Sequence, residues 1–149
     1  MDDLVQWLGE QLDDDEGIAR AATPGPWRVR DDGVVGDEGK HWPVAYTDSH
    51  RAREDCLHVA EHDPARVLRE IDAKRQALAL YTATVEDREA LRARMRQVIN
   101  SDPDEFGKLR QRESELINAE ARLRPVVRLL ALPYAARPGF RPEWAGGPR

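Results

Sequence analysis

Apolar residues recur at helical spacing near the start of the chain. Leu4, Leu8 and Leu12 are four residues apart, which places their side chains on one face of a helix. The two prolines of the segment Thr23-Pro24-Gly25-Pro26 cannot continue such a helix. We therefore predict a first helix over Asp2–Arg20.

Three short extended segments follow. Apolar and charged residues alternate in Trp27–Arg30, as in a strand with one buried face. Asp31-Asp32-Gly33 is a turn signal, and the extended pattern resumes at Val34-Val35. After a polar loop at 36–40, residues 42–46 indicate a third strand. We predict a β-hairpin or a three-stranded meander. Two or three short strands are not stable alone, so this sheet must lie against a helix.

The rest of the chain is dominated by helical patterns. Residues 50–62 form a short helical segment that ends at Asp63-Pro64. This pair is a strong helix start, because Asp accepts hydrogen bonds from first-turn amides and proline fits the first helical position. Asp102-Pro103 repeats the signal and divides the remaining pattern into helices at 63–100 and 102–132. We expect these two helices to form an antiparallel hairpin with a seam close to that of a coiled coil.

Prolines and aromatic residues distinguish the C-terminal part. Pro125 is expected to kink or restart the second hairpin helix, and Pro133 to end it. The strongly apolar residues 126–132 are assigned to the core. The tail is rich in Pro and Gly but also contains aromatic residues, namely Tyr134, Phe140 and Trp144. Its first half is therefore expected to pack back on the body, and its last few residues to be loose.

These elements predict an α+β fold that is mostly α. A chain of 149 residues is long enough for one compact domain, so we predict a single domain over 1–149. Its predicted parts are residues 1–62, the helical hairpin 63–133 and the tail 134–149. No apolar run approaches the roughly 20 residues that cross a membrane. The acidic start is unlike a signal peptide, and one cysteine cannot form an internal disulfide. We expect a cytoplasmic protein.

The net charge of −5 conceals an uneven distribution. Residues 1–63 contain 16 Asp and Glu but 6 Lys and Arg, a net charge of −10. Residues 64–149 contain 12 Asp and Glu and 17 Lys and Arg, a net charge of +5. The two parts can pair within the fold or between subunits.

His58 and His62 are the best candidates for a metal site. They are four residues apart in the short helix, so both imidazoles can reach one point. Metalloproteases share this spacing, but their catalytic Glu directly follows the first His, whereas Glu61 precedes the second His here. Cys56 faces elsewhere, and a structural zinc site needs four ligands. The alternative, which we prefer, is that His62 caps a helix end and His58 packs partly buried.

Other catalytic patterns are weak. Cys56 has no basic partner on its own helix face, so a buried structural thiol is the better interpretation. The sequence contains no P-loop and no Gly-x-Ser-x-Gly motif. No cofactor is implied, and we expect a protein that is not an enzyme.

An arginine-rich strip is the candidate for nucleic-acid binding. Residues 88–96 contain four Arg, and further Arg residues follow in the next helix, namely Arg110, Arg112, Arg122, Arg124 and Arg128. Glu residues are interleaved with them, which favours pairing within and between the helices. The sequence pI of about 5.4 is also low for a phosphate binder. Nucleic-acid binding is therefore not our expectation.

Two segments together carry a family resemblance. They are Ala22–Trp27 (ATPGPW) and His58–Arg75 (HVAEHDPARVLREIDAKR), supported by Leu129–Tyr134 (LLALPY) and Pro142-Glu143-Trp144. With them the chain resembles an actinobacterial and actinophage family known as domain of unknown function 6221, from Met1 to about Trp144. The resemblance implies no particular activity, and it implies an accessory role in a phage or in host defence.

These observations lead to one principal hypothesis and two alternatives. The principal hypothesis is a non-enzymatic protein that forms a homodimer or other assembly through its helical hairpin and also binds a protein partner. It rests on the small core and on apolar residues that occupy more than one face of the long helix. The alternatives are a small metal-binding protein centred on His58 and His62, with zinc as the ion, and a nucleic-acid binder.

Overall fold

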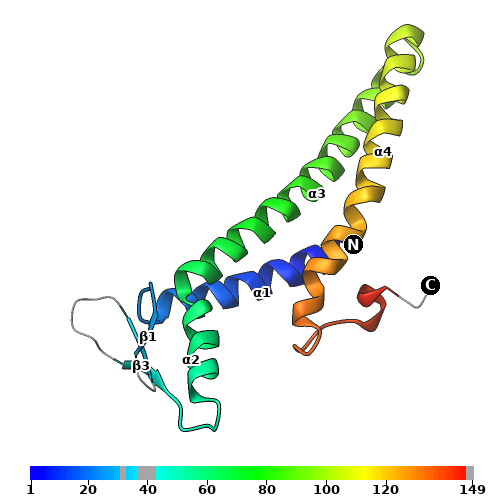
Figure 1. Cartoon of the computed structure of the whole chain (residues 1–149). Helices are drawn as coiled ribbons and strands as arrows, with labels where there is room; N and C mark the ends of the chain where they lie inside the picture. Colours follow the sequence, from blue (N-terminus) through cyan, green and yellow to red (C-terminus); the bar gives the residue numbers. More distant parts are fainter. Residues whose placement is uncertain (31–32, 37–42, 147–149) are drawn as a thin grey trace. The chain divides into compact units, whose positions relative to one another are not determined.

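The computed structural model describes residues 1–30, 33–36 and 43–146. Its elements follow one another as shown in Figure 1. They are α1 (Asp2–Ala21), β1 (Arg28–Arg30), β2 (Gly33–Val35), β3 (Pro43–Tyr46), α2 (Ala52–Glu61), α3 (Pro64–Val98), α4 (Pro103–Ala131), and the short 3-10 helices η1 (Leu132–Tyr134) and η2 (Pro142–Ala145). The mostly helical α+β fold is confirmed, and every predicted helix is present with ends within two residues of the prediction.

Some predictions concern residues that lie outside the described ranges. They are the turn residues Asp31 and Asp32, the loop after Gly36, and the start of the third strand at Trp42. Within the described ranges, no helix is both long and apolar enough to cross a membrane.

The chain divides into two compact units. One consists of residues 10–73, and the other of residues 1–9 together with 74–149. Helices α1 and α3 each contribute residues to both units. The single domain over 1–149 stays a prediction.

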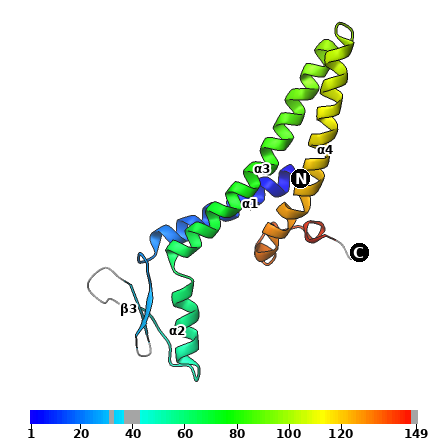
Figure 2. The same ribbon diagram turned by 45° about the horizontal axis from the view of Figure 1, so that its top comes forward.

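The unit of residues 10–73 contains the sheet and α2. The strands lie in the order β1-β2-β3 and both pairs are antiparallel, with Val34 opposite Val29 on one side and Ala45 on the other. Val34 is fully buried, and α2 contacts β1 and β2. Figures 1 and 2 show α2 beside the strands. The predicted meander supported by a helix is therefore confirmed, although β1 begins at Arg28 rather than at Trp27.

In the other unit, α4 runs antiparallel to the second part of α3. Arg88 pairs with Glu120 at 2.8 Å, and Arg94 pairs with Glu105 at 2.8 Å. From Arg88 to Arg94 the residue number rises along α3, while that of the α4 partner falls from Glu120 to Glu105. This order is expected for antiparallel helices. Both views show the two helices side by side near the turn that joins them. The predicted helical hairpin is therefore present.

One face of α4 supplies the hairpin core. Its buried residues are Leu116, Glu120, Val127 and Ala131. The assignment of all of 126–132 to the core was wrong. Val126, Leu129 and Leu132 have exposed fractions of 39%, 64% and 39%. These three side chains are exposed because their positions point away from the helix side that carries the buried Val127 and Ala131.

Helix α4 continues through Pro125, so the predicted restart at this residue does not occur. The proline removes one backbone donor and leaves the carbonyl of Ala121 without its helical partner. Both residues are exposed, so that solvent can satisfy this carbonyl. The ribbon of α4 changes direction in its C-terminal part in both views, in agreement with the predicted kink (Figures 1 and 2).

The tail packs on the first turns of α1, as predicted for its first half. The Trp7 ring lies 5.6 Å from that of Phe140 and 5.3 Å from that of Trp144, between ring centroids. The indole Nε1 of Trp7 donates to the Pro138 carbonyl at 3.1 Å. Trp144 is buried, so the packed region extends beyond the first half of the tail. The predicted loose end includes residues 147–149, which lie outside the described ranges.

Candidate functional site at the α2–α3 corner

The corner between α2 and α3 is fixed by side-chain and backbone hydrogen bonds. The Asp63 carboxylate accepts from the Arg66 backbone N–H at 2.7 Å, which caps the start of α3 before Pro64. The Arg66 guanidinium donates to the Glu61 carbonyl at 3.0 Å, and so satisfies an acceptor at the end of α2. The predicted cap and corner at Asp63-Pro64 are confirmed.

The loop before β1 lies directly against this cap. A Cβ atom added at Gly25 would come within 2.5 Å of the Asp63 carboxylate oxygen Oδ2. The Trp27 indole N–H donates to the Thr23 carbonyl at 2.8 Å, which fixes the ring beside the loop. The two sequence segments that carry the family resemblance therefore meet at the corner.

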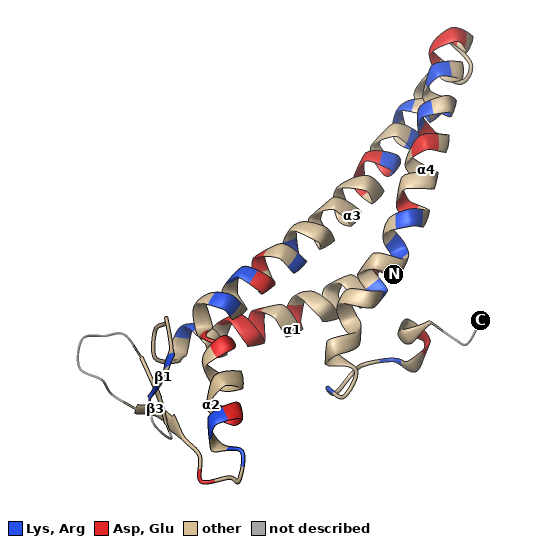
Figure 3. Ribbon diagram, viewed as in Figure 1, with Lys and Arg blue, Asp and Glu red and all other residues tan. Residues whose placement is uncertain are grey.

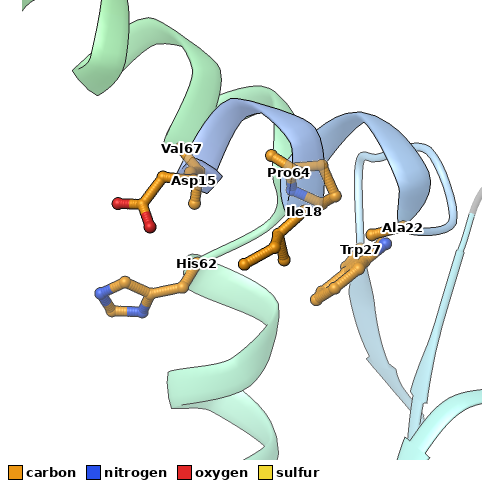
Figure 4. A pocket seen from close by; sticks show the side chains of 8 residues that line it. Asp15, Ile18, Ala22, Trp27, His62, Pro64 and Val67 are labelled. Carbon is orange, nitrogen blue, oxygen red and sulfur yellow. The ribbon is translucent and has the colours of Figure 1, made fainter. Parts of the chain in front are cut away.

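A groove of about 280 Å³ opens where these segments meet α1. Its walls are formed by Asp15, Ile18, Ala19, Ala22, Trp27, His62, Pro64 and Val67. Figure 4 shows the polar side chains of Asp15 and His62 at one end of the groove and Ile18, Ala22 and Trp27 at the other. Ile18 is 69% exposed. Such a lining suits binding of an apolar group better than bond-breaking chemistry, because the wall offers no nucleophile with an adjacent base.

The two histidines lie side by side at the end of α2. Their ring centroids are 4.4 Å apart with an angle of 48° between the rings. His62 is the C-cap residue of α2, as the preferred interpretation expected, and its Nδ1 lies 2.8 Å from the His58 carbonyl oxygen. The expected partial burial of His58 was wrong, because both imidazoles are exposed. The solvent-facing side of a short amphipathic helix accounts for this exposure.

Among the described residues, additional metal ligands are not gathered at this corner. In the described ranges, no group of three or more His, Cys, Asp or Glu side chains is placed to hold a metal ion. Cys56 is 2% exposed, as expected for a buried structural cysteine. Of the ligands predicted from the sequence, the structure places the imidazoles of His58 and His62 next to each other.

The arginine-rich strip forms ion pairs along the hairpin. Arg92 pairs with Glu113 and Arg112 with Glu115, in addition to the pairs of Arg88 and Arg94. Figure 3 shows basic and acidic residues following one another along α3 and α4. The expected pairing of the interleaved charges is confirmed.

A buried polar cluster in the hairpin was not foreseen from the sequence. Glu120 is 3% exposed and pairs with Arg88 and Arg124. Burial, together with the nearby Glu120 charge, raises the pKa of the Tyr81 hydroxyl above 10.0, although a hydrogen bond with Arg124 opposes the shift. The hydrogen bond to Glu120 also raises the pKa of Arg124. The spacing along α4 could have indicated this burial. Glu120 lies four residues after Leu116 and seven before Val127, which places its carboxylate on the core face of the helix.

Comparison with known proteins gives one family match. The model of a family of unknown function, DUF6221, matches residues 1–146. No curated protein and no solved structure matches the chain.

Proposed function

This chain belongs to the family of unknown function DUF6221, and we propose that it is a non-enzymatic assembly protein that self-associates through its helical hairpin. The observation that carries the proposal is an apolar stripe at the C-terminal end of α4, made by Val126 and Leu129 of the helix and by Leu132, which follows it at the start of η1. All three side chains are exposed, and they lie on the helix side opposite the buried Val127 and Ala131.

The stripe differs from scattered surface leucines. Its members are three residues apart, so they are neighbours on one helix face and form a continuous apolar surface. Soluble proteins usually cover such contiguous surfaces with a partner. Arg122 and Arg128 lie on the same helix close to the stripe, and a polar rim around an apolar centre is typical of protein interfaces.

A second copy of this chain fits the surface by charge. Residues 64–149, which include the stripe, have a net charge of +5, whereas residues 1–63 have −10. Each copy therefore offers an acidic part to the basic part of the other. Closed two-fold dimers are the commonest homo-oligomers, so a homodimer is the proposed assembly.

The mass of the protein in solution tests this proposal. Light scattering or sedimentation from low to high micromolar concentration is expected to show a concentration-dependent dimer. Leu129→Glu places a charge in the stripe and is expected to leave a monomer. Leu80→Glu is the matched control, because Leu80 is 63% exposed on α3 and Leu129 is 64% exposed on α4.

Two outcomes would contradict the proposal. One is a wild-type monomer throughout the concentration range. The other is a dimer that Leu129→Glu leaves intact, or that Leu80→Glu weakens to the same extent. Circular dichroism of both variants confirms that each retains its helical content.

The proposed setting is cytoplasmic, in a phage or in host defence, with a further protein partner. The single cysteine suits a reducing compartment, and the accessory role follows the family resemblance. Affinity capture from the native host, with Leu129→Glu as the comparison bait, tests whether a partner uses the same stripe.

A further inference from the structure

We propose that His58 and His62 form a bidentate surface site for a divalent transition-metal ion that favours imidazole ligands, of the class of Zn²⁺, Ni²⁺ and Cu²⁺. The site lies at the C-terminal end of α2, where His62 also lines the groove described above. It goes beyond the self-association proposed above and uses none of the residues of the apolar stripe.

The spacing on the helix brings the two imidazoles to one place. Residues four apart lie one above the other on the same helix face. The ring centroids of His58 and His62 are 4.4 Å apart, so the rings are already adjacent without a change of backbone. Both side chains are exposed, and an ion can reach them from solvent.

A hydrogen bond prepares His62 as a ligand. Its Nδ1 lies 2.8 Å from the His58 carbonyl oxygen. A carbonyl oxygen only accepts hydrogen bonds, so Nδ1 must carry the proton and donate. In the neutral ring this leaves the lone pair on Nε2, on the far side of the imidazole. Histidines that bind metals in proteins commonly make such a bond from the other ring nitrogen to a backbone carbonyl.

The ligand types decide the class of ion. Imidazole nitrogen suits Zn²⁺, Ni²⁺ and Cu²⁺, whereas Mg²⁺ and Ca²⁺ prefer oxygen ligands. In the described part of the chain, no third His, Cys, Asp or Glu is placed to hold one metal ion together with these two histidines. Solvent therefore completes the coordination, which makes the site open rather than a closed structural zinc site.

Calorimetric titration of the full chain with ZnCl₂ and with NiCl₂ at neutral pH tests the proposal. The expected result is one ion bound per chain. His58→Ala and His62→Ala are each expected to weaken binding by more than the ~10–100-fold that loss of an outer-sphere partner costs, because each removes a ligand. Alanine favours the helix, so His58→Ala is expected to keep α2 folded.

His50→Ala is the matched control, because His50 is an exposed histidine in the turn before α2. It is expected to bind both ions as the wild type does. NMR gives the position of the ion independently, since substoichiometric Cu²⁺ should broaden the amide signals around residues 58–62 first.

Three results would overturn the proposal. They are no binding to the wild type, unchanged binding to the double variant His58→Ala/His62→Ala, and broadening centred elsewhere in the chain. MgCl₂ is expected to give no binding heat, and competition by Mg²⁺ for the same site would also contradict the inference.

Discussion

At Gly25, the absence of a side chain decides how closely the loop before β1 can approach the start of α3. Gly25→Ala would place a methyl group within 2.5 Å of the Asp63 oxygen Oδ2, so the carboxylate must shift and disturb the cap that its Oδ1 makes with the Arg66 N–H. Loss of an N-cap hydrogen bond costs about 1 kcal/mol of stability. We expect at least this decrease in the free energy of unfolding, measured by urea denaturation.

Gly17→Ala is the control for this substitution. Gly17 lies inside α1, and an added Cβ there meets no atom within 4 Å. Alanine in a helix interior is expected to raise stability by about 0.5–1 kcal/mol. Equal effects of the two substitutions would contradict the role given to the Gly25–Asp63 contact.

Glu120 carries a buried negative charge, which is stabilised by the positive charges of Arg88 and Arg124. Glu120→Gln keeps the shape of the side chain but leaves Arg88, whose side chain is 20% exposed, without its counter-ion. Breaking a buried ion pair on one side costs about 3–5 kcal/mol. We expect a decrease near the lower end of that range, because the other partner, Arg124, is half exposed.

Glu113→Gln provides the comparison for the buried pair. Its partner Arg92 has an exposed fraction of 48%, so solvent screens this pair and about 0.2–1 kcal/mol is expected. Denaturation of both variants by urea, which is uncharged and does not screen ion pairs, measures the difference. A loss at Glu120 no greater than that at Glu113 would contradict the importance of burial.

Tyr81 makes stability depend on alkaline pH. Burial and the Glu120 charge raise the pKa of Tyr81 in the folded protein above its ordinary value of 10.0. Above about pH 10 the unfolded chain loses this proton while the folded chain retains it, so the unfolded state binds fewer protons. Stability is therefore expected to fall as the pH rises past that point. Tyr81→Phe should flatten the fall, measured by urea denaturation at several alkaline pH values; an unchanged slope would exclude Tyr81 as the cause.

At the scale of the element, the start of α4 depends on Asp102. Its carboxylate accepts a hydrogen bond from the Glu105 backbone N–H at 2.9 Å. Asp102→Ala removes this cap and is expected to lower the free energy of unfolding by about 1 kcal/mol. Asp102→Asn should restore most of the loss, because asparagine caps helices about as well. Thermal denaturation compares the two variants, and an equal loss in both would show that charge rather than capping matters.

The helices were predictable because their boundaries have local causes. Asp63 and Asp102 cap helix starts through their own side chains and the prolines that follow, so the sequence contains the whole signal. The exposure of Leu129 was not predictable in this way. An apolar run such as 126–132 does not say which of its faces is covered, since that depends on where the hairpin core lies.

The candidate site was predictable only in part. The spacing of His58 and His62 gave their shared face, but not their exposure, which depends on how the described elements pack around the end of α2. The approach of Gly25 to Asp63 joins residues that are distant in the sequence, and no local pattern reports it. The ion pair of Glu120 with Arg88 likewise joins residues of two different helices.

At the scale of the whole chain, the first and last described segments are joined by aromatic packing. Trp7 near the start contacts Phe140 and Trp144 near the end, and the Arg141 guanidinium pairs with the Asp3 carboxylate at 2.9 Å. The packing requires the chain at Gly139 to pass close over the Trp7 indole. A Cβ atom at Gly139 would lie 2.9 Å from the Trp7 Nε1.

Substitutions at two glycines of the tail separate the effect of this contact from the effect of backbone strain. Gly139 and Gly146 both have positive φ values, 83° and 75°, so alanine at either position introduces backbone strain of about 1–3 kcal/mol. An added Cβ at Gly146 meets nothing within 4 Å, whereas at Gly139 it also displaces the Trp7 ring. Gly139→Ala is therefore expected to destabilise the chain more than Gly146→Ala does, and to expose Trp7.

Hydrogen exchange and tryptophan fluorescence distinguish the two variants. In Gly139→Ala we expect faster amide exchange in residues 2–9 and 134–145 together, and a red-shifted emission as indole rings become hydrated. Gly146→Ala should leave the exchange of residues 2–9 close to that of the wild type. If Gly139→Ala accelerated exchange in the tail alone, the first turns of α1 would be stable without it, and the aromatic contact would not hold the two ends of the chain together.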